Sequence, residues 1–222
     1  MMMNVQVDKT VFEIEKVRVL TPSTYVLRFS RNDMKFTPGQ HLVLGLPGSD
    51  QLREYSIYSG VRDPFLEVLI KEVDEGMVSK QLKQIRLGDP VEVRGPYGFF
   101  MANAPGQGSR KLLFIASGTG IAPFHSFVKS NPVSEYRLIH GVRSMEEAYD
   151  AGEYDPKKLV VCTSRDTRGS FKGRLTDYLQ QAEIDTEAVA YLCGNSEMIY
   201  EAMEILQQRG IPQRHLFTEV YF

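Results

Sequence analysis

The stretch Leu112-Leu113-Phe114-Ile115-Ala116-Ser117-Gly118-Thr119-Gly120-Ile121-Ala122-Pro123 decides the fold of the second half of this 222-residue chain. Its uninterrupted apolar start predicts a buried strand, and the two glycines followed by a proline predict a tight turn into a helix. Glycines admit a close backbone approach, and the free N–H groups of a helix start favour negative charge. The turn Gly118, Thr119 and Gly120 is therefore a candidate phosphate site, with an ordinary strand-to-helix turn as the alternative.

The segments around this stretch repeat the alternation of strand and helix. We expect buried strands at 111–116, 136–140, 159–163 and 190–193, and helices that begin near Ala122, Met145, Arg174 and Ser196. Strands that alternate with helices form an open parallel sheet. The second half is therefore predicted to be an α/β domain.

The first half of the chain has a different period. Short alternating runs separated by turn residues predict an antiparallel barrel or sandwich, with strands at 11–19, 24–30, 41–46, 55–59, 65–73 and 91–94. One amphipathic helix is expected at 77–85. The turn-rich segment 101–110 predicts a domain boundary, which places one domain at 1–104 and the other at 105–222.

Composition excludes several classes of function. The chain is 42% hydrophobic and 24% charged, and no apolar run approaches the roughly 20 residues of a membrane span. Lys and Arg number 26 against 28 Asp and Glu, so no basic field favours nucleic acid. The two cysteines cannot supply a zinc cage or an iron-sulfur cluster, and the four histidines lack metal spacing, so we expect no metal. The start at 1–8 lacks the features of a secretion signal, which predicts a cytoplasmic protein.

Two motifs in the first half carry further chemistry. In Arg53-Glu54-Tyr55-Ser56, the arginine can bind a diphosphate, the tyrosine offers a flat surface for a ring, and the serine hydroxyl can reach a ring nitrogen. The alternative is a barrel strand with an exposed arginine. The turn Gly76-Met77-Val78-Ser79 presents free N–H groups and is a second candidate phosphate site, with a plain helix cap as its alternative.

These motifs, in this order, resemble those of the ferredoxin-NADP reductase family. Similar sequences at 95–98 (GPYG) and 191–198 (YLCGNSEM) complete the resemblance, which covers nearly the whole chain. It implies a Greek-key β-barrel that binds FAD, followed by a Rossmann-like domain that binds NADP(H). The reactive rings of the two cofactors would meet in the cleft between the domains.

The resemblance also implies roles for individual residues. Ser56 would lie near the flavin nitrogen that accepts the hydride, Cys193 would lie at the nicotinamide, and Glu219 would help proton traffic. Tyr221 would cover the flavin until the nucleotide displaces it, and Phe222 would lie toward the adenine of FAD. The positions implied for FAD are Arg53, Glu54, Tyr55, Ser56, Leu69, Ile70, Lys71, Gly76, Met77, Val78, Ser79, Tyr221 and Phe222. Those implied for the nicotinamide nucleotide are Gly118, Gly120, Arg143, Ser164, Arg165, Arg174 and Gly194, and Thr119 would lie near the flavin from the other domain.

The preference between NADPH and NADH depends on positive charge near the adenosine ribose. The loop 165–174 holds four cations, and one acid, Asp166, lies among them. A solvated surface loop is the alternative. Because the pairs Ser164-Arg165 and Gly173-Arg174 resemble positions used by NADP-binding members, we expect NADPH. The four cations are Arg165, Arg168, Lys172 and Arg174.

The predicted function is a flavoprotein oxidoreductase that transfers hydride between NADPH and FAD. It would exchange single electrons with a separate small carrier, a ferredoxin or flavodoxin, and would be a monomer or weak dimer. Alternatives are a free-flavin reductase, an NADH-dependent reductase component of an oxygenase, and a non-enzymatic electron-transfer subunit. A basic rim for an acidic carrier would draw on Lys16, Arg18, Lys35, Lys157 and Lys158.

Overall fold

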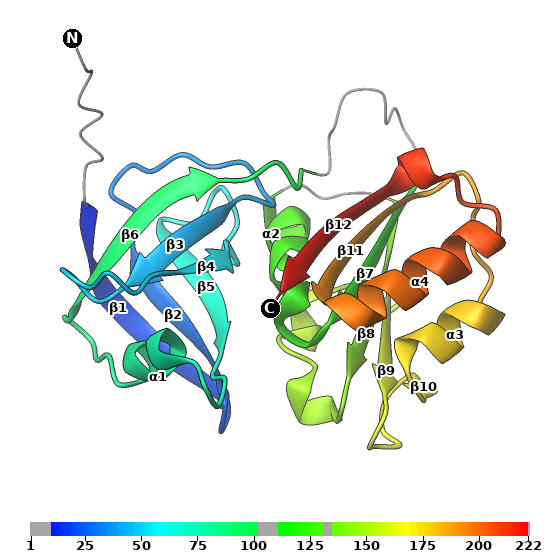
Figure 1. Cartoon of the computed structure of the whole chain (residues 1–222), viewed down its shortest axis with the longest axis horizontal. Helices are drawn as coiled ribbons and strands as arrows, with labels where there is room; N and C mark the ends of the chain where they lie inside the picture. The colour runs from blue at the N-terminus through cyan, green and yellow to red at the C-terminus, as the bar shows by residue number, and fades with distance from the viewer. Residues whose placement is uncertain (1–9, 102–110, 131–134, 222) are drawn as a thin grey trace, which may run out of the picture.

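A computed structural model describes residues 10–101, 111–130 and 135–221 of the chain. The described residues form two six-stranded sheets, one from each half of the sequence. The two domains lie side by side, and the carboxyl end of the last strand points to the boundary between them (Figure 1). The predicted boundary after Ala104 falls within 102–110, outside the described residues, and stays a prediction.

The first domain is the predicted antiparallel barrel. Its strand order is β4-β3-β6-β1-β2-β5, and the bridge between Ile57 and Val68 joins its two outer strands. Apolar residues at alternating positions fill the interior, and Val78 and Leu82 of the helix α1 are buried in the same core. The elements are β1 (Thr10–Thr21), β2 (Thr24–Ser30), β3 (His41–Gly45), β4 (Arg53–Ser56), β5 (Phe65–Lys71), α1 (Met77–Lys83) and β6 (Pro90–Tyr97).

The second domain is the predicted parallel sheet, in the order β10-β9-β8-β7-β11-β12. The central strand β7 is buried along almost its whole length, as its continuous apolar sequence predicts. Helices α3 and α4 cover one face, and α2 lies on the barrel side (Figure 1). The elements are β7 (Leu112–Ser117), α2 (Ala122–Ser130), β8 (Tyr136–Val142), β9 (Leu159–Thr163), β10 (Phe171–Lys172), α3 (Leu175–Gln181), β11 (Val189–Asn195), α4 (Ser196–Gln208) and β12 (Leu216–Tyr221).

Two expectations about local structure were wrong. No α-helix begins near Met145; the connection between β8 and β9 forms two short 3-10 turns, η2 (Met145–Glu147) and η3 (Ala151–Glu153). Asp150 breaks the helical path because it adopts a left-handed conformation with φ of 49°. The strand expected at 55–59 ends at Ser56, and the short strand β10 was not predicted because two residues carry no period.

One apolar cluster crosses the domain boundary. It joins Tyr58 and Leu69 of the barrel to Phe114, Ala116 and Cys193 of the parallel sheet. The carboxyl ends of β7 and β11 therefore rest directly against the barrel. In the described parts of the chain, no helix is long and apolar enough to cross a membrane.

Candidate active site at the domain boundary

Side chains from both domains meet where β4 approaches the end of β12. The Ser56 hydroxyl donates to Glu219 Oε1 at 2.6 Å, and the Tyr221 hydroxyl donates to Ser56 Oγ at 2.6 Å. Cys193 lies opposite Glu219 in the register of β11 with β12, and Glu219 and Tyr221 both act on the pKa of its thiol. The structure thus brings together the four residues expected to be catalytic, whose catalytic roles stay predictions.

Burial controls the protonation of this group. Burial raises the pKa of Glu219, and the hydrogen bond from Ser56 offsets part of that rise. Burial also raises the pKa of the Cys193 thiol well above its usual range, with the Glu219 charge adding to it. Cys193 is therefore a neutral thiol at physiological pH rather than a nucleophile, and Glu219 is suited to hold a proton.

The glycine turn after β7 packs against this group. It forms a 3-10 turn, η1 (Gly118–Ile121), that leads into α2. A Cβ built on Gly120 would lie 2.3 Å from the carbonyl oxygen of Cys193, so only glycine allows the turn to approach the end of β11. The candidate phosphate turn and Cys193 are therefore held in backbone contact.

A histidine that we had not placed at the site supports this turn. His140 on β8 is buried, and its Nε2 lies 2.8 Å from the carbonyl oxygen of Gly118. Burial lowers the pKa of His140 to about 4, so the neutral ring donates its Nε2 proton to that carbonyl. The parallel pairing of β7 with β8 places His140 beside Ala116. The sequence predicts a parallel sheet but not this strand order, so it gave no direct signal for His140.

The turn before α1 is closed by its own serine. Ser79 Oγ accepts from the backbone N–H of Val73 at 3.3 Å and donates to the carbonyl oxygen of Gly76 at 3.4 Å. A Cβ on Gly76 would lie 2.3 Å from Val73 Cγ2. The side chains of Val78 and Ser79 are buried, so these two residues can offer a phosphate only their backbone N–H groups.

The charge in the first helical turn separates the two candidate phosphate turns from the other helix starts. Helices α1 and α2 and the turn η1 have no acidic residue in the first turn, whereas α3 carries Asp177 and α4 carries Glu197. An acid there neutralises the positive end of the helix dipole. Among the four described α-helices, α1 and α2 thus keep an electropositive N-terminal end, and these are the two helices that follow the predicted phosphate turns.

The arginine-tyrosine motif lies on β4 beside the site. Arg53 and Glu54 are exposed, and Tyr55 is half-buried against the barrel core. No described carboxylate forms an ion pair with the Arg53 guanidinium, which donates to the carbonyl oxygen of Leu52. Arg53 is therefore available to a phosphate.

The predicted backbone contacts at 69–71 lie on β5, the last strand of the barrel sheet. Leu69 and Ile70 are buried, and Lys71 is half-buried. Their partner strand is β2, and on the opposite edge the described bridge reaches only Val68. The edge of β5 at 69–71 can therefore face a ligand.

Two candidate cations for a 2′-phosphate lie side by side. The backbone N–H of Arg165 donates to the carbonyl oxygen of Arg143 at 2.8 Å, so both residues extend from the carboxyl ends of neighbouring strands. Both side chains are exposed, and no carboxylate among the described residues pairs with either guanidinium. Ser164 next to them and Arg174 at the start of α3 are exposed as well.

Arg168 differs from its neighbours and corrects the expectation of four available cations. Its guanidinium lies 2.6 Å from a Glu146 oxygen and 2.7 Å from an Asp166 oxygen. Asp166 also accepts backbone hydrogen bonds from Met145 and Thr167, so both groups are already satisfied within the loop. Phe222 lies outside the described residues.

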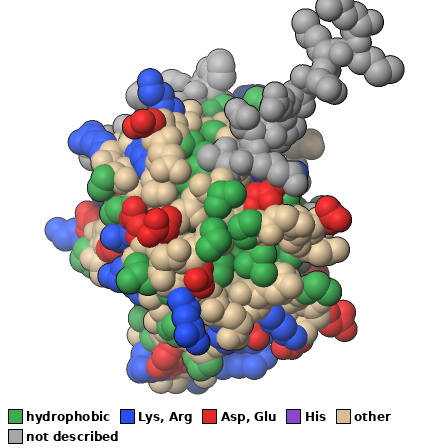
Figure 2. Space-filling view, turned by 90° about the vertical axis from the view of Figure 1, so that its left-hand side faces the viewer, with side chains coloured by type: hydrophobic (Ala, Val, Ile, Leu, Met, Phe, Trp, Pro, Cys, Tyr) green, Lys and Arg blue, Asp and Glu red, His purple; other side chains and the backbone are tan. Residues whose placement is uncertain are grey.

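The expected basic rim is incomplete. Arg18 is bound to Asp150 in a bidentate ion pair and does not project from the surface as a rim residue. On the barrel side of the molecule, Lys and Arg are interspersed with Asp and Glu, and hydrophobic side chains gather near the middle (Figure 2). No segregated basic patch is visible on that face.

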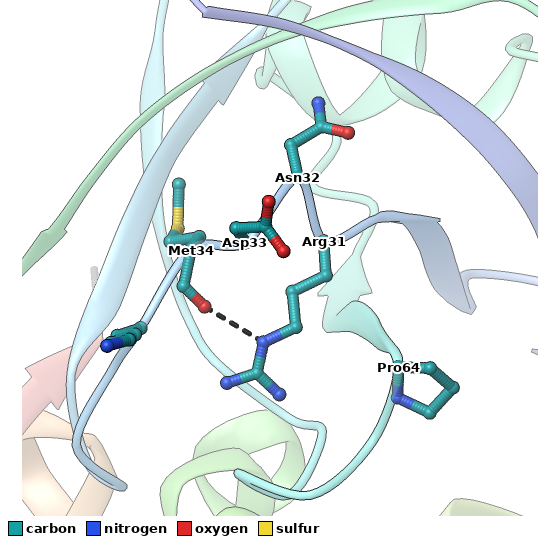
Figure 3. Close-up of a pocket in the computed structure, with 6 residues that line it drawn as sticks. Arg31, Asn32, Asp33, Met34 and Pro64 are labelled. Carbon is teal, nitrogen blue, oxygen red and sulfur yellow. Dashed lines mark hydrogen bonds between the residues drawn. The ribbon is translucent and has the colours of Figure 1, made fainter.

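A hollow beside two loops of the barrel does not belong to this site. It is lined by 31–35 and Pro64 (Figure 3). Arg31 donates to the carbonyl oxygens of Met34, Val61 and Asp63, so its guanidinium joins two loops and is not free for a ligand. We assign this hollow a structural role.

Comparisons with known proteins identify both domains. A family model described as "Oxidoreductase FAD-binding domain" matches residues 11–101, and one described as "Oxidoreductase NAD-binding domain" matches residues 114–204. The ferredoxin-NADP reductase of Azotobacter vinelandii is 30% identical over 84% of this chain and 84% of its own length. The chain belongs to the ferredoxin-NADP reductase family.

Other members of the family have different partners in their names. The toluate 1,2-dioxygenase electron transfer component of Pseudomonas putida is 30% identical over 94% of this chain. A ferredoxin NADP+ reductase from Neisseria gonorrhoeae, solved with bound FAD and NADP, superposes with a TM-score of 0.84 at 23% identity and covers 96% of this chain and 98% of its own. The chain spans 66% of the toluate component, and 65% of a probable dihydroorotate dehydrogenase B electron transfer subunit from Pyrococcus abyssi.

The residues present fit both cofactors of the family. The tight turn at Gly76 and the exposed Arg53 suit the diphosphate of FAD, and the turn at Gly118 and Gly120 suits the diphosphate of a nicotinamide nucleotide. As a member of this family, the chain carries an oxidoreductase FAD-binding domain followed by an oxidoreductase NAD-binding domain.

Proposed function

We propose that this protein is an NADPH-dependent reductase that keeps FAD bound and exchanges electrons with a separate ferredoxin or flavodoxin. The observation that carries the proposal is the hydrogen-bonded chain Tyr221, Ser56 and Glu219, which spans the two domains beside the nucleotide turn. When bound, FAD supplies the chemistry, because it accepts a hydride from reduced nicotinamide and releases its electrons singly.

The barrel domain would hold FAD. Arg53 would bind the diphosphate, together with the backbone N–H groups of the turn that begins at Gly76, and Tyr55 would offer its ring surface. The backbone of 69–71 and the side chain of Glu54 would complete the site. Tyr221 would contact the flavin from the other domain.

The polar chain would control the proton. Each hydroxyl in the hydrogen-bonded chain donates to the next group: Tyr221 donates to Ser56, and Ser56 donates to Glu219. A carboxyl whose pKa is raised by burial takes up a proton more readily than an exposed one, and it would return that proton through the serine hydroxyl. With a proton on Glu219, the carboxyl would donate to Ser56 Oγ, and the serine hydroxyl proton would then be free for a hydrogen bond to the reacting ring.

The preference for NADPH rests on Arg143 and Arg165. Both residues are exposed, their backbones are hydrogen-bonded to each other, and neither guanidinium group has a described carboxylate partner, which suits a phosphate site. Asp166, the nearest acid in sequence, is occupied by Arg168 and by backbone N–H groups and so does not compete for a ribose hydroxyl. Ser164 and Arg174 would add a hydroxyl and a further charge.

A separate carrier is proposed because this sequence cannot bind an iron-sulfur cluster. Both cysteines, Cys162 and Cys193, are buried, and they lie on different strands of the parallel sheet. Four thiolates at one site are the usual requirement for such a cluster.

An anaerobic titration of the purified yellow protein with NADPH, and of a second sample with NADH, tests the proposal. We expect the flavin absorbance to bleach at micromolar NADPH and only poorly with NADH. Equal bleaching would instead favour an NADH-dependent reductase component of the kind named among the relatives. A colourless protein that oxidises NADPH only after free flavin is added would make flavin a substrate and contradict the proposal.

A further inference from the structure

The connection between β8 and β9 binds the barrel in place of covering the sheet. At its tip, the Tyr149 hydroxyl lies 3.0 Å from Thr24 Oγ1 on β2. Next to it, Asp150 accepts from both terminal nitrogens of Arg18 on β1, at 2.6 and 2.7 Å. The Asp150 side chain is only 14% exposed, so water screens this pair weakly. We call residues 143–158 the crossover strap.

The strap and α2 also bind the chain segment that follows the active-site serine. The Tyr58 hydroxyl donates to Asp150 Oδ2 at 2.7 Å. The carbonyl oxygen of Tyr58 lies 2.6 Å from Nδ1 of His125, and the carbonyl oxygen of Ser59 accepts from the Ser126 hydroxyl at 2.7 Å. The segment 56–59 is thus held by the nucleotide domain at three of its four residues.

His125 is held in a single orientation. Nδ1 faces the carbonyl oxygen of Tyr58, and Nε2 faces a carboxylate oxygen of Glu153 at 3.1 Å. The ring also stacks on the Tyr58 ring, with centroids 3.8 Å apart and planes inclined by 11°. These contacts fix the His125 ring against Tyr58.

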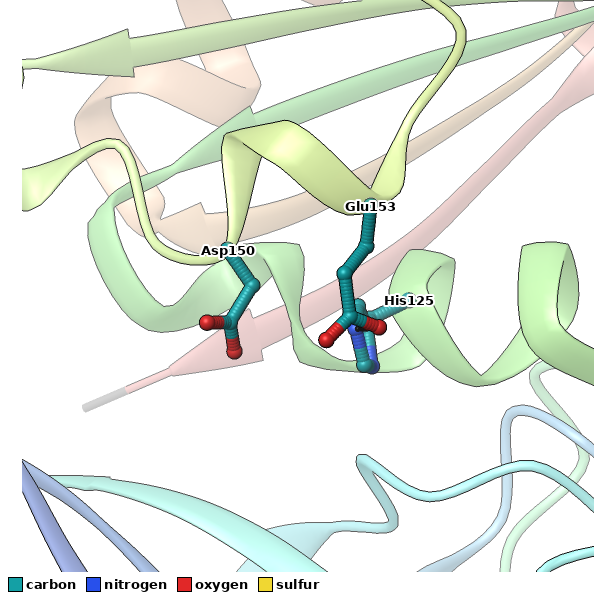
Figure 4. Close-up of side chains that lie close together, drawn as sticks. All are labelled: His125, Asp150 and Glu153. Carbon is teal, nitrogen blue, oxygen red and sulfur yellow. Dashed lines mark hydrogen bonds and ion pairs between the residues drawn. The ribbon is translucent and has the colours of Figure 1, made fainter.

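The same three side chains could suggest a metal site, but their existing partners argue against one. Ligand atoms of His125, Asp150 and Glu153 lie within 4.8 Å of one another (Figure 4). Both Asp150 oxygens already accept from Arg18, and one of them also accepts from Tyr58. A divalent cation would have to displace the guanidinium of Arg18 or lie beside its charge.

We infer that Asp150 and His125 are positioning residues, which hold the segment 56–59 against the nucleotide domain and so keep Ser56 in contact with Glu219 and Tyr221. Ser56 and Tyr58 are two residues apart on one extended segment, so a shift of the Tyr58 anchor is transmitted directly to the Ser56 hydroxyl. The consequence for hydride transfer rests on the proposed function. The mechanical part of the inference does not.

The mechanical part is tested by hydrogen exchange of the full-length, flavin-loaded protein without nucleotide. Asp150→Asn removes the charge that binds Arg18, and Tyr58→Phe removes a single oxygen atom. Asp155→Asn is the matched control, because Asp155 lies in the same strap and its side chain accepts from the backbone N–H of Lys157, with no hydrogen bond or ion pair to the barrel among the described residues. We expect the amides of Ile57 and Tyr58 to exchange about tenfold faster in both variants and unchanged in the control, from the loss of a charged hydrogen bond.

The exchange data have two outcomes that would overturn the inference. One is unchanged exchange at 57–58 in both variants. The other is an equal increase throughout the barrel, including β1 and β2, which would mean a general loss of stability. If Asp150→Asn does not fold, Tyr58→Phe alone decides, since it removes no charge.

Rapid-mixing kinetics test the positioning of Ser56. We expect the rate of flavin reduction to fall about tenfold in both variants while the dissociation constant of the nucleotide stays unchanged. Faster exchange with an unchanged reduction rate would show that the crossover strap does not position Ser56. If the parent protein itself fails to reduce its flavin, the proposed function fails, and the exchange result still decides whether the crossover strap holds the segment 56–59.

Discussion

Replacing Gly120 by alanine tests whether the nucleotide turn depends on backbone contact with Cys193. The new Cβ would lie 2.3 Å from the Cys193 carbonyl oxygen and 2.7 Å from Gly194 Cα. Ordinary contact begins at 3.4 Å, so the turn must move by the difference of 1.1 Å. Because the obstructing atoms belong to the backbone, we expect a cost near the top of the range of about 1–3 kcal/mol for overpacking.

The displacement should also weaken nucleotide binding. N–H groups that move by 1.1 Å lose their alignment with a diphosphate. Each hydrogen bond to a charged group is worth about 1.5–3 kcal/mol, so the dissociation constant should rise about tenfold or more. Urea denaturation and a nucleotide titration measure the two effects.

Gly118→Ala provides the control for this prediction. Gly118 has a φ of 53°, and no heavy atom lies within 4 Å of the position of its Cβ. The substitution should therefore cost only the roughly 1–2 kcal/mol of a left-handed alanine, without displacing the turn. Equal nucleotide affinity in the Gly120→Ala variant and the parent protein would refute the reasoning.

Three further predictions concern charge. Burial raises the pKa of folded Glu219 above its ordinary 4.5, so the folded state binds more protons than the unfolded state above that pH, and the free energy of unfolding falls as pH rises. Glu219→Gln should remove this fall. In urea denaturation, the gain in stability of the variant over the parent protein should therefore be larger at about pH 8 than at about pH 4. Arg165→Ala should raise the dissociation constant of NADPH about tenfold or more and leave that of NADH unchanged. Arg168→Ala should raise the dissociation constant of NADPH less, because Glu146 and Asp166 already bind that guanidinium. Equal increases in the two variants would contradict the assignment. Burial raises the pKa of the Cys162 thiol to about 12, so iodoacetamide should alkylate it in the unfolded but not the native protein, as measured by mass spectrometry.

Much of the fold could be predicted because the two domains have different hydrophobic periods. Alternation with a period of two in the first half and long apolar runs in the second gave the correct sheet types. The helix expected near Met145 failed for a tertiary reason. Tyr149 and Asp150 face the barrel, where Thr24 and Arg18 bind them, and that distant pairing outweighs local helix preference.

The site was predictable where short motifs carry it and not where distant residues form it. The pattern at 53–56 and the ending at Glu219 and Tyr221 placed these residues at one site through family resemblance. His140 was missed because its role depends on the register of two parallel strands. Tyr58 and Asp150 were missed because they are 92 residues apart in the sequence and meet only across the domain boundary.

The central claim is that Ser56, held between Glu219 and Tyr221, supplies the hydroxyl on which flavin reduction depends. The most direct test is the anaerobic, single-turnover rate of flavin reduction by NADPH in Ser56→Ala, with the flavin content measured on the same sample. We predict a fall of about a hundredfold at unchanged flavin content, as expected for the loss of one positioned donor. A rate equal to that of the parent protein would contradict the claim.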